Sequence, residues 1–302
     1  MSEDSSKENI PGTNDEVVVT IGLPTYNRPE GLRKCLSHLV EQTYRNLEII
    51  ISDNCSSDPG VQEIIHEYTK KDNRIRAFRQ PENIGLENNF NFLYAQSTAS
   101  YFMWMSDDDY FDHDYVENCM AFLKQNPGYV LSSGTAHYYS GNDFLFTEKM
   151  FPVDQATPFK RVLKYFSQVG KNGNFYGIFR RDFFMETPVG IHAGCDWSFM
   201  ARLAVYGKLS YLNTTGYHRS AAGNSATRKR MVRKFKLNWF QTIFFETYLA
   251  GQIAGNIFND AQARKQMPYW KRKLLVIFVF FQINYRLFIH FIKRRILGRK
   301  VN

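Results

Sequence analysis

Short apolar runs alternate with helical patterns along the first hundred residues, and this alternation is what most constrains the fold of the chain. Apolar runs over residues 17–23, 47–51, 74–78 and 101–105 each have the length of a strand. Apolar residues recur at helical spacing between them, and the first helix is expected to begin at Pro29. Strands that are separated by helices pair in parallel through right-handed crossovers. The sequence therefore predicts an α/β fold with a Rossmann-like open, mostly parallel sheet flanked by helices.

Polar clusters follow three of the predicted strands, at the edge where parallel sheets bind their ligands. The clusters are residues 24–28, residues 52–58 and the acidic triplet Asp107, Asp108 and Asp109. Three consecutive carboxylates repel one another unless a cation lies among them, and a divalent metal with a phosphorylated ligand meets that need. The alternative is an acidic turn that caps the next helix, as Asn27 and Asp58 are expected to cap theirs. A ligand explains three clusters at one edge better than capping does.

Composition narrows the class of protein. Of the 302 residues, 44% are hydrophobic, which is typical of a folded chain. Residues 1–16 lack the pattern of a signal peptide and are expected to be a disordered lead-in. The four cysteines are widely spaced and are expected to be buried thiols in a reducing compartment. The sequence contains no Gly-x-Gly-x-x-Gly and no Gly-Lys-Ser/Thr loop, so neither a dinucleotide fold nor a P-loop is supported.

The net charge of +9 is unevenly distributed along the chain. Residues 228–302 contain 17 Lys and Arg against two acidic residues and carry +15, so residues 1–227 carry −6. An acidic body with a basic tail indicates an anionic surface as the partner of the tail. A nucleic-acid binder would carry its basic residues throughout the folded body, so we expect no nucleic-acid partner.

The basic tail contains a nineteen-residue apolar segment over residues 274–292, which nearly matches a bilayer span. Gln282, Arg286 and His290 interrupt it at intervals of four and would form one polar stripe on a helix. We interpret this segment as a helix lying in the plane of an anionic leaflet. The alternatives are a C-terminal helix packed in the fold or at a homo-oligomer contact and, third, a true span. A further helix is expected over residues 240–257.

Several short motifs occur in the order known from one family. They are Pro24-Thr25-Tyr26-Asn27-Arg28, Gln42-Thr43-Tyr44, residues 47–53, Asn83-x-Gly85 and the acidic triplet. This ordered set resembles the family 2 glycosyltransferases with the glycosyltransferase A fold, closely over about residues 17–120 and more loosely to about residue 220. The resemblance implies an inverting, metal-dependent enzyme that moves a sugar from a nucleotide-diphosphate sugar to an acceptor hydroxyl. The basic tail favours a lipid-linked or cell-surface glycan as acceptor.

The resemblance also implies roles for residues at matching positions. Those assigned to the nucleotide-sugar donor are Pro24, Thr25, Tyr26, Asn27, Arg28, Asp53, Asn83, Gly85, Asn88, Asp107 and Asp108. Tyr26 would stack on the base, Asp53 would accept a hydrogen bond from the base edge, and Asp107 would lie near the ribose. Asp108 and Asp109 would hold Mn²⁺ or Mg²⁺ against the diphosphate, although any of the three carboxylates could be the ligand.

The chain departs from the family pattern after Gly85. A basic residue often lies there in the family, whereas this chain has Glu87, Asn88 and Asn89. Phosphate handling is therefore expected to fall to the metal or to the small-residue loop at residues 220–225.

An inverting transfer needs a base that takes the proton of the acceptor hydroxyl. Asp196 is the candidate, because it precedes an amphipathic helix and resembles the acidic base position of the family, with Cys195 in place of the usual preceding acid. The alternative for Asp196 is a helix N-cap. His218 follows the strand expected over residues 209–212, where some relatives use a histidine as a further metal ligand. The alternative for His218 is an ordinary polar loop residue.

We thus expect four regions in the chain. Residues 17–130 form the nucleotide-sugar-binding half and residues 131–227 the acceptor-side half of one catalytic domain, after the lead-in at residues 1–16. Residues 228–302 form a C-terminal helical extension that associates with a membrane or oligomerises. The expected location is cytoplasmic and peripheral, on the inner face of the membrane. The alternative function is a catalytically silent sugar-nucleotide or glycan-binding scaffold, which the triplet and Asp196 argue against.

Overall fold

The computed structural model describes residues 17–183, 189–221 and 228–296. The predicted lead-in and most of the loop at residues 220–225 lie outside them. The strands are β1 (Val19–Thr25), β2 (Leu47–Asp53), β3 (Ile75–Arg79), β4 (Tyr101–Trp104), β5 (Tyr110–Phe111), β6 (Tyr129–Ser140), β7 (Asp143–Thr147), β8 (Ile178–Arg180) and β9 (Lys208–Ser220). The helices are α1 (Pro29–Val40), α2 (Pro59–Lys71), α3 (Leu86–Gln96), α4 (Tyr115–Gln125), α5 (Pro158–Gln168), α6 (Cys195–Tyr206), α7 (Arg228–Lys234), α8 (Trp239–Ile243), α9 (Phe245–Asn259), α10 (Ala261–Gln266) and α11 (Tyr269–Ile296). Two short 3₁₀ turns, η1 (Gly173–Tyr176) and η2 (Arg181–Phe183), flank β8.

The described strands form one sheet in the order β3-β2-β1-β4-β8-β6-β9-β5, with β7 paired to β6. Neighbours are parallel from β3 to β4 and between β6 and β9, whereas β8 is antiparallel to both of its neighbours. The predicted α/β fold with flanking helices is confirmed, and the four strands expected over residues 17–105 are all present and parallel. The sheet as a whole is mixed, because four of the described pairings are parallel and four are antiparallel. The two predicted halves, which meet at residue 130, share one continuous sheet, because β8 lies between β4 and β6.

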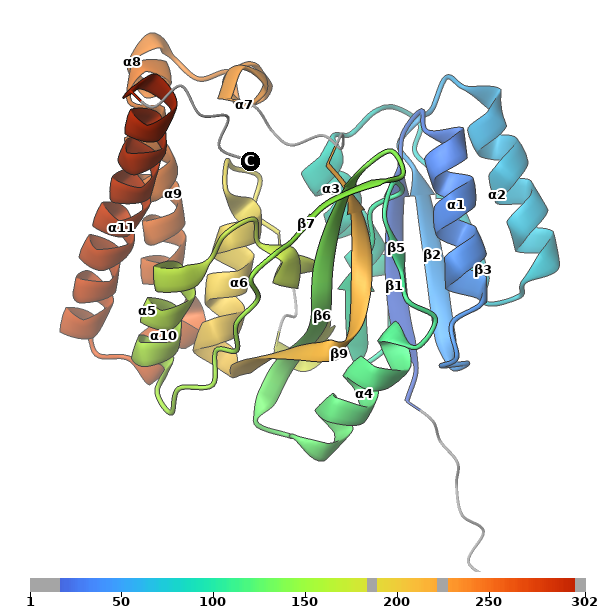
Figure 1. The fold of residues 1–302 in the computed structure, drawn as a ribbon, viewed down its shortest axis with the longest axis horizontal. Helices are drawn as coiled ribbons and strands as arrows, with labels where there is room; N and C mark the ends of the chain where they lie inside the picture. The colour runs from blue at the N-terminus through green and yellow to red at the C-terminus, as the bar shows by residue number, and fades with distance from the viewer. Residues whose placement is uncertain (1–16, 184–188, 222–227, 297–302) are drawn as a thin grey trace, which may run out of the picture.

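Helices cover both faces of the sheet, and each face has its own hydrophobic core (Figure 1). One core lies under α1, α2 and α4, and the other lies under α3, α5 and α6. Trp104 is fully buried in the second core, where its ring stacks on Phe175 at 5.3 Å. Strands buried on both faces read as continuous apolar runs, which is why they could be recognised in the sequence.

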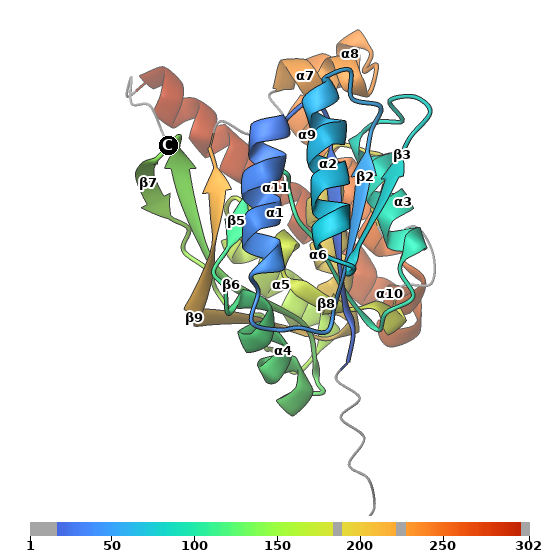
Figure 2. The same cartoon turned by 90° about the vertical axis from the view of Figure 1, so that its right-hand side faces the viewer.

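The C-terminal helices form an additional layer outside α5 and α6. Leu275, Val279 and Ile283 of α11 are buried in the second core together with residues of α9. The single helix expected over residues 240–257 is wrong, because the chain breaks at Phe244 into α8 and α9. Figures 1 and 2 both show α7 and α8 at the end of the molecule where the parallel strands finish. This extension therefore reaches the edge of the sheet at which the sequence predicts a ligand.

The long helix α11 has one buried side and one exposed side. One side packs within the protein, as in the alternative of a packed helix, and a second apolar stripe faces outward. Trp270, Leu274, Ile277, Phe281 and Tyr285 make up this outer stripe and are 47–67% exposed. Within the described residues, no helix combines the length and the apolar character needed to cross a bilayer.

Candidate active site

The acidic triplet lies directly after β4 and holds the loop that follows β1. The Thr25 hydroxyl donates to Asp107 at 2.8 Å, and the Tyr26 amide donates to the same carboxylate oxygen at 3.4 Å. Arg28 is the cation among these carboxylates, since its Nη1 lies 2.9 Å from Asp107 and 3.0 Å from Asp108. Burial raises the pKa of Asp107, although Arg28 and the Thr25 hydroxyl act in the opposite direction. Asp107 thus holds the loop predicted to bind the base, through hydrogen bonds to Thr25 and Tyr26 and an ion pair with Arg28.

Asp109 is 4% exposed and contacts residues at the end of β9. It accepts a hydrogen bond from the Ser220 amide at 2.9 Å, and the Arg219 guanidinium lies 3.5 Å away. Burial raises the pKa of Asp109 to about 7, because desolvation outweighs the attraction of Arg219 and Asp108 adds a like charge. Arg219 Nε is itself buried with no hydrogen-bond partner among the described residues. One donor of the Arg219 guanidinium thus has no hydrogen bond at the point where a charged ligand is expected.

The carboxylates of Asp108 and Asp109 suit a hard divalent cation by their chemistry. Mg²⁺ is commonly held by one or two carboxylates together with the phosphates of its substrate, so a third protein ligand is not needed. Among the described residues, no three His, Cys, Asp or Glu side chains are grouped as a metal site would require. By their chemistry Asp108 and Asp109 stay the candidate ligands, and the described residues do not group His218 with them.

His218 faces the other side of β9 from Arg219, because neighbouring residues of a strand point to opposite faces. Its ring stacks on Tyr110 at 4.4 Å, and its nitrogens contact Asp112 Oδ1 at 2.8 Å and Tyr139 Oη at 3.2 Å. The expected set of Asp108, Asp109 and His218 is therefore not brought together. His218 is also no loop residue, since it lies inside β9 and pairs with Tyr110 of β5.

The rings around His218 form a column that extends from His137 through Tyr110 to His38. Burial lowers the pKa of His38 and of His137, and neighbouring positive charges add to the effect at both.

The folded chain therefore binds fewer protons than the unfolded chain just below pH 6.5, so stability should fall as the pH drops from about 6.5 through the lowered pKa values. We expect denaturation midpoints to decrease between pH 7 and pH 5, and His38→Gln to flatten that slope. His66→Gln, on the exposed side of α2, is the control, and an equal slope in both variants would contradict the assignment.

Asp53, at the end of β2, is fully buried and already has partners on both oxygens. The Ser56 amide donates to Oδ1 at 2.9 Å, while Gln62 and Arg79 reach Oδ2 at 2.5 and 2.9 Å. Arg79 itself is 44% exposed, so Asp53 holds a cation at the edge of the site. Direct hydrogen bonding of Asp53 to a base stays a prediction, and in this geometry it requires a partner of Asp53 to move.

The loop after β1 contacts the loop after β2. Asn27, in the left-handed region with φ 52°, accepts hydrogen bonds from the amides of Ser57 and Asp58 at 2.8 and 3.1 Å. The expectation that Asn27 caps its helix is wrong, because its side chain reaches across to the next loop. Asp58 does cap α2, by accepting from the Gly60 amide at 2.9 Å. Pro24 is buried within β1, and Tyr26 is 44% exposed above the loop.

The predicted donor residues before α3 also form a connected turn. Asn83 accepts from Asn54 Nδ2 and from the Gly85 amide, both at 3.0 Å. Gly85 has φ 82° and begins α3, and Asn88 donates to the Ile84 carbonyl at 2.7 Å. A basic side chain does reach this turn from elsewhere in the chain, since Lys234 of α7 pairs with the buried Glu87. No local pattern in the sequence indicates this pairing, because the two residues are 147 positions apart.

Asp196 lies in the first turn of α6, whose N-cap is Gly194, so the alternative that Asp196 is the cap is wrong. Asn172 Nδ2 donates to Asp196 Oδ2 at 3.0 Å. Burial raises the pKa of Tyr176, and the charges of Asp109, Asp108 and Asp196 all act in the same direction. The Arg219 guanidinium, which pairs with Asp109, lies 4.8 Å over the Tyr176 ring, and Asn172 caps the short turn that contains Tyr176. The triplet and Asp196 therefore belong to one connected region. The triplet is not an acidic cap of the next helix either, because β5 follows it and Asp114 begins α4.

Comparison with known proteins identifies the family. The sequence model described as glycosyl transferase family 2 matches residues 20–188. The chain belongs to this family. It is 34% identical over 133 residues to the glycosyltransferase GlyA of Streptococcus pneumoniae serotype 4. The aligned residues cover 44% of this chain and 18% of GlyA. It is also 26% identical over 141 residues to GlyG of the same organism, covering 43% of this chain and 46% of GlyG.

The glycosyltransferase A fold is confirmed by solved structures. The S. aureus TarS 1-349 structure in complex with UDP-GlcNAc superimposes with a TM-score of 0.64 at 16% identity, covering 94% of this chain and 76% of that one. The mannosyltransferase PcManGT from Pyrobaculum calidifontis, in complex with GDP-Man and Mn²⁺, gives 0.56 at 14% identity, with 87% and 69% covered. The family 2 chain spans less than half the length of the curated relatives it matches.

Proposed function

We propose that this family 2 chain is an inverting glycosyltransferase that moves a sugar from a nucleotide-diphosphate sugar to an acceptor hydroxyl. The observation that carries the proposal is the set of contacts between the triplet and Asp196. Arg219 pairs with Asp109 and lies 4.8 Å over the Tyr176 ring, and Asn172, which caps the turn of Tyr176, donates to Asp196. Residues 17–130 would bind the donor, and residues 131–227 would form the acceptor side. A glycan or lipid-linked acceptor is part of the proposal.

The donor would be held by groups from three segments of the chain, and a fourth would act on the acceptor. Tyr26 would lie against the base, and Asp107 would fix the loop that carries it. A divalent cation held by Asp108 and Asp109 would stabilise the negative charge that develops on the departing nucleoside diphosphate. Arg28 and Arg219 contribute fixed positive charge next to those carboxylates. Asp196 would take the proton of the acceptor hydroxyl as the sugar bond forms.

Nucleotide binding offers the direct test of this function. Thermal unfolding is followed with UDP-, GDP-, CDP- and dTDP-sugars, each with Mn²⁺ and with EDTA. We expect one nucleotide to raise the melting temperature and the effect to depend on the metal ion. Absence of stabilisation by every nucleotide, with Mn²⁺ and with anionic vesicles present, would contradict the proposed donor class.

We also propose that the C-terminal helices contact an anionic membrane surface, with the cytoplasmic face as the predicted side. The outer stripe of α11 supports this proposal, because aromatic and aliphatic side chains there are next to Lys271 and Lys273. Trp239 and Phe240 of α8 add further exposed aromatic surface. A homo-oligomer contact on the same stripe is the alternative.

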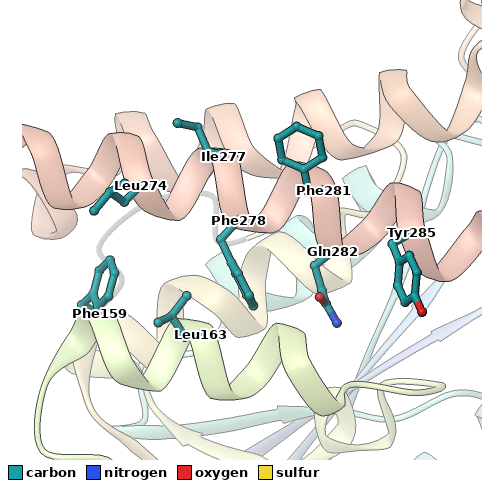
Figure 3. A pocket seen from close by; sticks show the side chains of 8 residues that line it. All are labelled: Phe159, Leu163, Leu274, Ile277, Phe278, Phe281, Gln282 and Tyr285. Atoms are coloured by element: carbon teal, nitrogen blue, oxygen red, sulfur yellow. The ribbon is translucent and has the colours of Figure 1, made fainter.

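The stripe also borders a groove on the protein. Between α5 and α11 the groove has a volume of about 690 Å³ and is lined mainly by apolar side chains. Figure 3 shows Phe278 and Gln282 pointing toward α5, while Ile277 and Phe281 point away from it. Gln282 thus faces the groove, and the predicted polar stripe begins there and not at the outer surface. The side chains of Arg286 and His290 lie outside the described residues.

Vesicle flotation tests the membrane contact. The chain should float with phosphatidylglycerol vesicles, and less so with phosphatidylcholine or at high salt, because anionic lipid attracts the basic tail. The double variant Trp270→Ser/Phe281→Ser should reduce flotation severalfold. The control is Phe144→Ser on β7, whose side chain is 56% exposed. Flotation that is unchanged in the double variant, or a concentration-dependent dimer abolished by it, would favour the oligomer instead.

A further inference from the structure

Both polar atoms of the Asn172 side chain have hydrogen-bond partners. It is 4% exposed, and its backbone is left-handed at φ 61°. Its Oδ1 accepts from the Tyr165 hydroxyl at 2.8 Å, and its Nδ2 donates to Asp196 Oδ2 at 3.0 Å. An ionised carboxylate only accepts hydrogen bonds, so the nitrogen of the amide must face Asp196. The orientation of the Asn172 side chain is therefore determined by its partners.

The short loop around Asn172 is clamped by a carboxylate on the strand side. Glu148 accepts hydrogen bonds from the amides of Lys171 and Gly173 at 2.8 and 3.1 Å, on both sides of Asn172. A Cβ at position 173 would lie 2.7 Å from Glu148 Oε2 and 2.9 Å from Ala136 Cβ, so a larger residue would have to displace both the Glu148 carboxylate and β6. The Tyr217 hydroxyl donates to the Gly173 carbonyl at 2.7 Å. The loop has little freedom to move the Asn172 amide.

This clamp also connects the two acidic sites. Tyr138 donates to Glu148 at 3.1 Å and accepts from Arg219 Nη1 at 3.0 Å. Arg219 in turn pairs with Asp109 of the triplet. Continuous contacts thus run from Asp109 through Arg219, Tyr138 and Glu148 to the loop of Asn172, and from there to Asp196. These contacts fix the position of Asp196 relative to the carboxylates proposed to hold the diphosphate end.

We propose that Asn172 is a positioning residue, which holds one oxygen of Asp196 and turns the other toward the acceptor. Among the described residues no hydrogen bond reaches Asp196 Oδ1, so this is the oxygen available for the acceptor proton. The inference rests on the proposed function, since it assumes that Asp196 is the base. A misplaced base costs turnover but leaves the donor site intact, because Asn172 contacts none of the residues assigned to the donor.

Two variants separate the side chain from the backbone it occupies. Glycine and aspartate both tolerate a left-handed backbone, so Asn172→Gly deletes the amide and Asn172→Asp replaces it by a carboxylate facing Asp196. Turnover is measured as nucleoside diphosphate released, with water as acceptor, from the nucleotide sugar that most stabilises the wild-type chain. We expect kcat to fall about tenfold to a hundredfold, because both variants lose a hydrogen bond to a charged group. The loss should be larger in Asn172→Asp, where a second carboxylate also repels Asp196. KM for the donor should stay within about twofold.

Crystal structures of both variants provide a readout that needs no turnover. The Asp196 carboxylate should leave its wild-type position in each of them. An unmoved carboxylate, or unchanged kcat in both variants while Asp196→Asn is inactive, would overturn the role of Asn172 and leave the proposed function intact. Wild-type turnover in Asp196→Asn would instead place the base elsewhere in the chain, and the role of Asn172 would fail with that assignment. Failure of the proposed function itself is recognised separately, as the absence of both donor stabilisation and turnover in the wild-type chain.

Discussion

Replacing Asp196 by asparagine is expected to abolish most turnover without weakening donor binding. A general base contributes about 10²–10⁴-fold to the rate, and we expect a loss of kcat in this range. The amide oxygen of the variant can still accept the hydrogen bond from Asn172, so local structure should be preserved. Nucleoside diphosphate release and donor-induced thermal stabilisation are measured on the same preparations.

A matched control for this variant is Glu117→Gln, which removes an exposed acidic residue from the first turn of α4. Both variants lose one negative charge near a helix N-terminus, so a general electrostatic effect would appear in both. A scaffold that only binds a sugar nucleotide or glycan would keep its function in Asp196→Asn. Retained turnover in this variant would place the base elsewhere in the chain.

Replacing Asp109 by asparagine is expected to remove the metal-dependent stabilisation by the donor. A ligand at a hundred times its Kd stabilises a protein by about 2.7 kcal/mol, which corresponds to a melting shift of roughly 5 °C for a chain of this size. The variant should show none of this shift with Mn²⁺, because an amide is a much weaker ligand than a carboxylate. Thermal unfolding with nucleotide sugar, in Mn²⁺ and in EDTA, measures the difference.

Loss of binding in Asp109→Asn can be distinguished from loss of folding. Because the pKa of Asp109 is raised to about 7 in the folded chain, its contribution to stability is present at low pH and is lost as the pH rises through 7. At pH 8 without ligand, the neutral variant should therefore be at least as stable as the wild type. Asp143→Asn, on the exposed strand β7, is the control. A full nucleotide shift in Asp109→Asn would move the metal ligand to Asp107 or Asp108.

Local sequence pattern predicted the donor half of the fold well. The first four strands, buried on both faces, read as continuous apolar runs, and Pro29 and Pro59 mark the starts of α1 and α2. The same pattern was much weaker after residue 106. The strands β5 and β8 are too short to show an alternation of apolar and polar residues. Because α8 and α9 are both rich in apolar residues, their sequences read as one continuous helix.

The sequence by itself determined the family, the strands over residues 17–105 and the edge at which the triplet lies. These features depend on residues that are close together in the chain. Only the tertiary structure decided which side chains neutralise the triplet. Arg219 reaches Asp109 from 110 positions away, and its neighbour His218 faces the opposite side of β9. Pairing of β9 with β6 and β5 sets that choice, and shifting its register by one residue would exchange the two side chains.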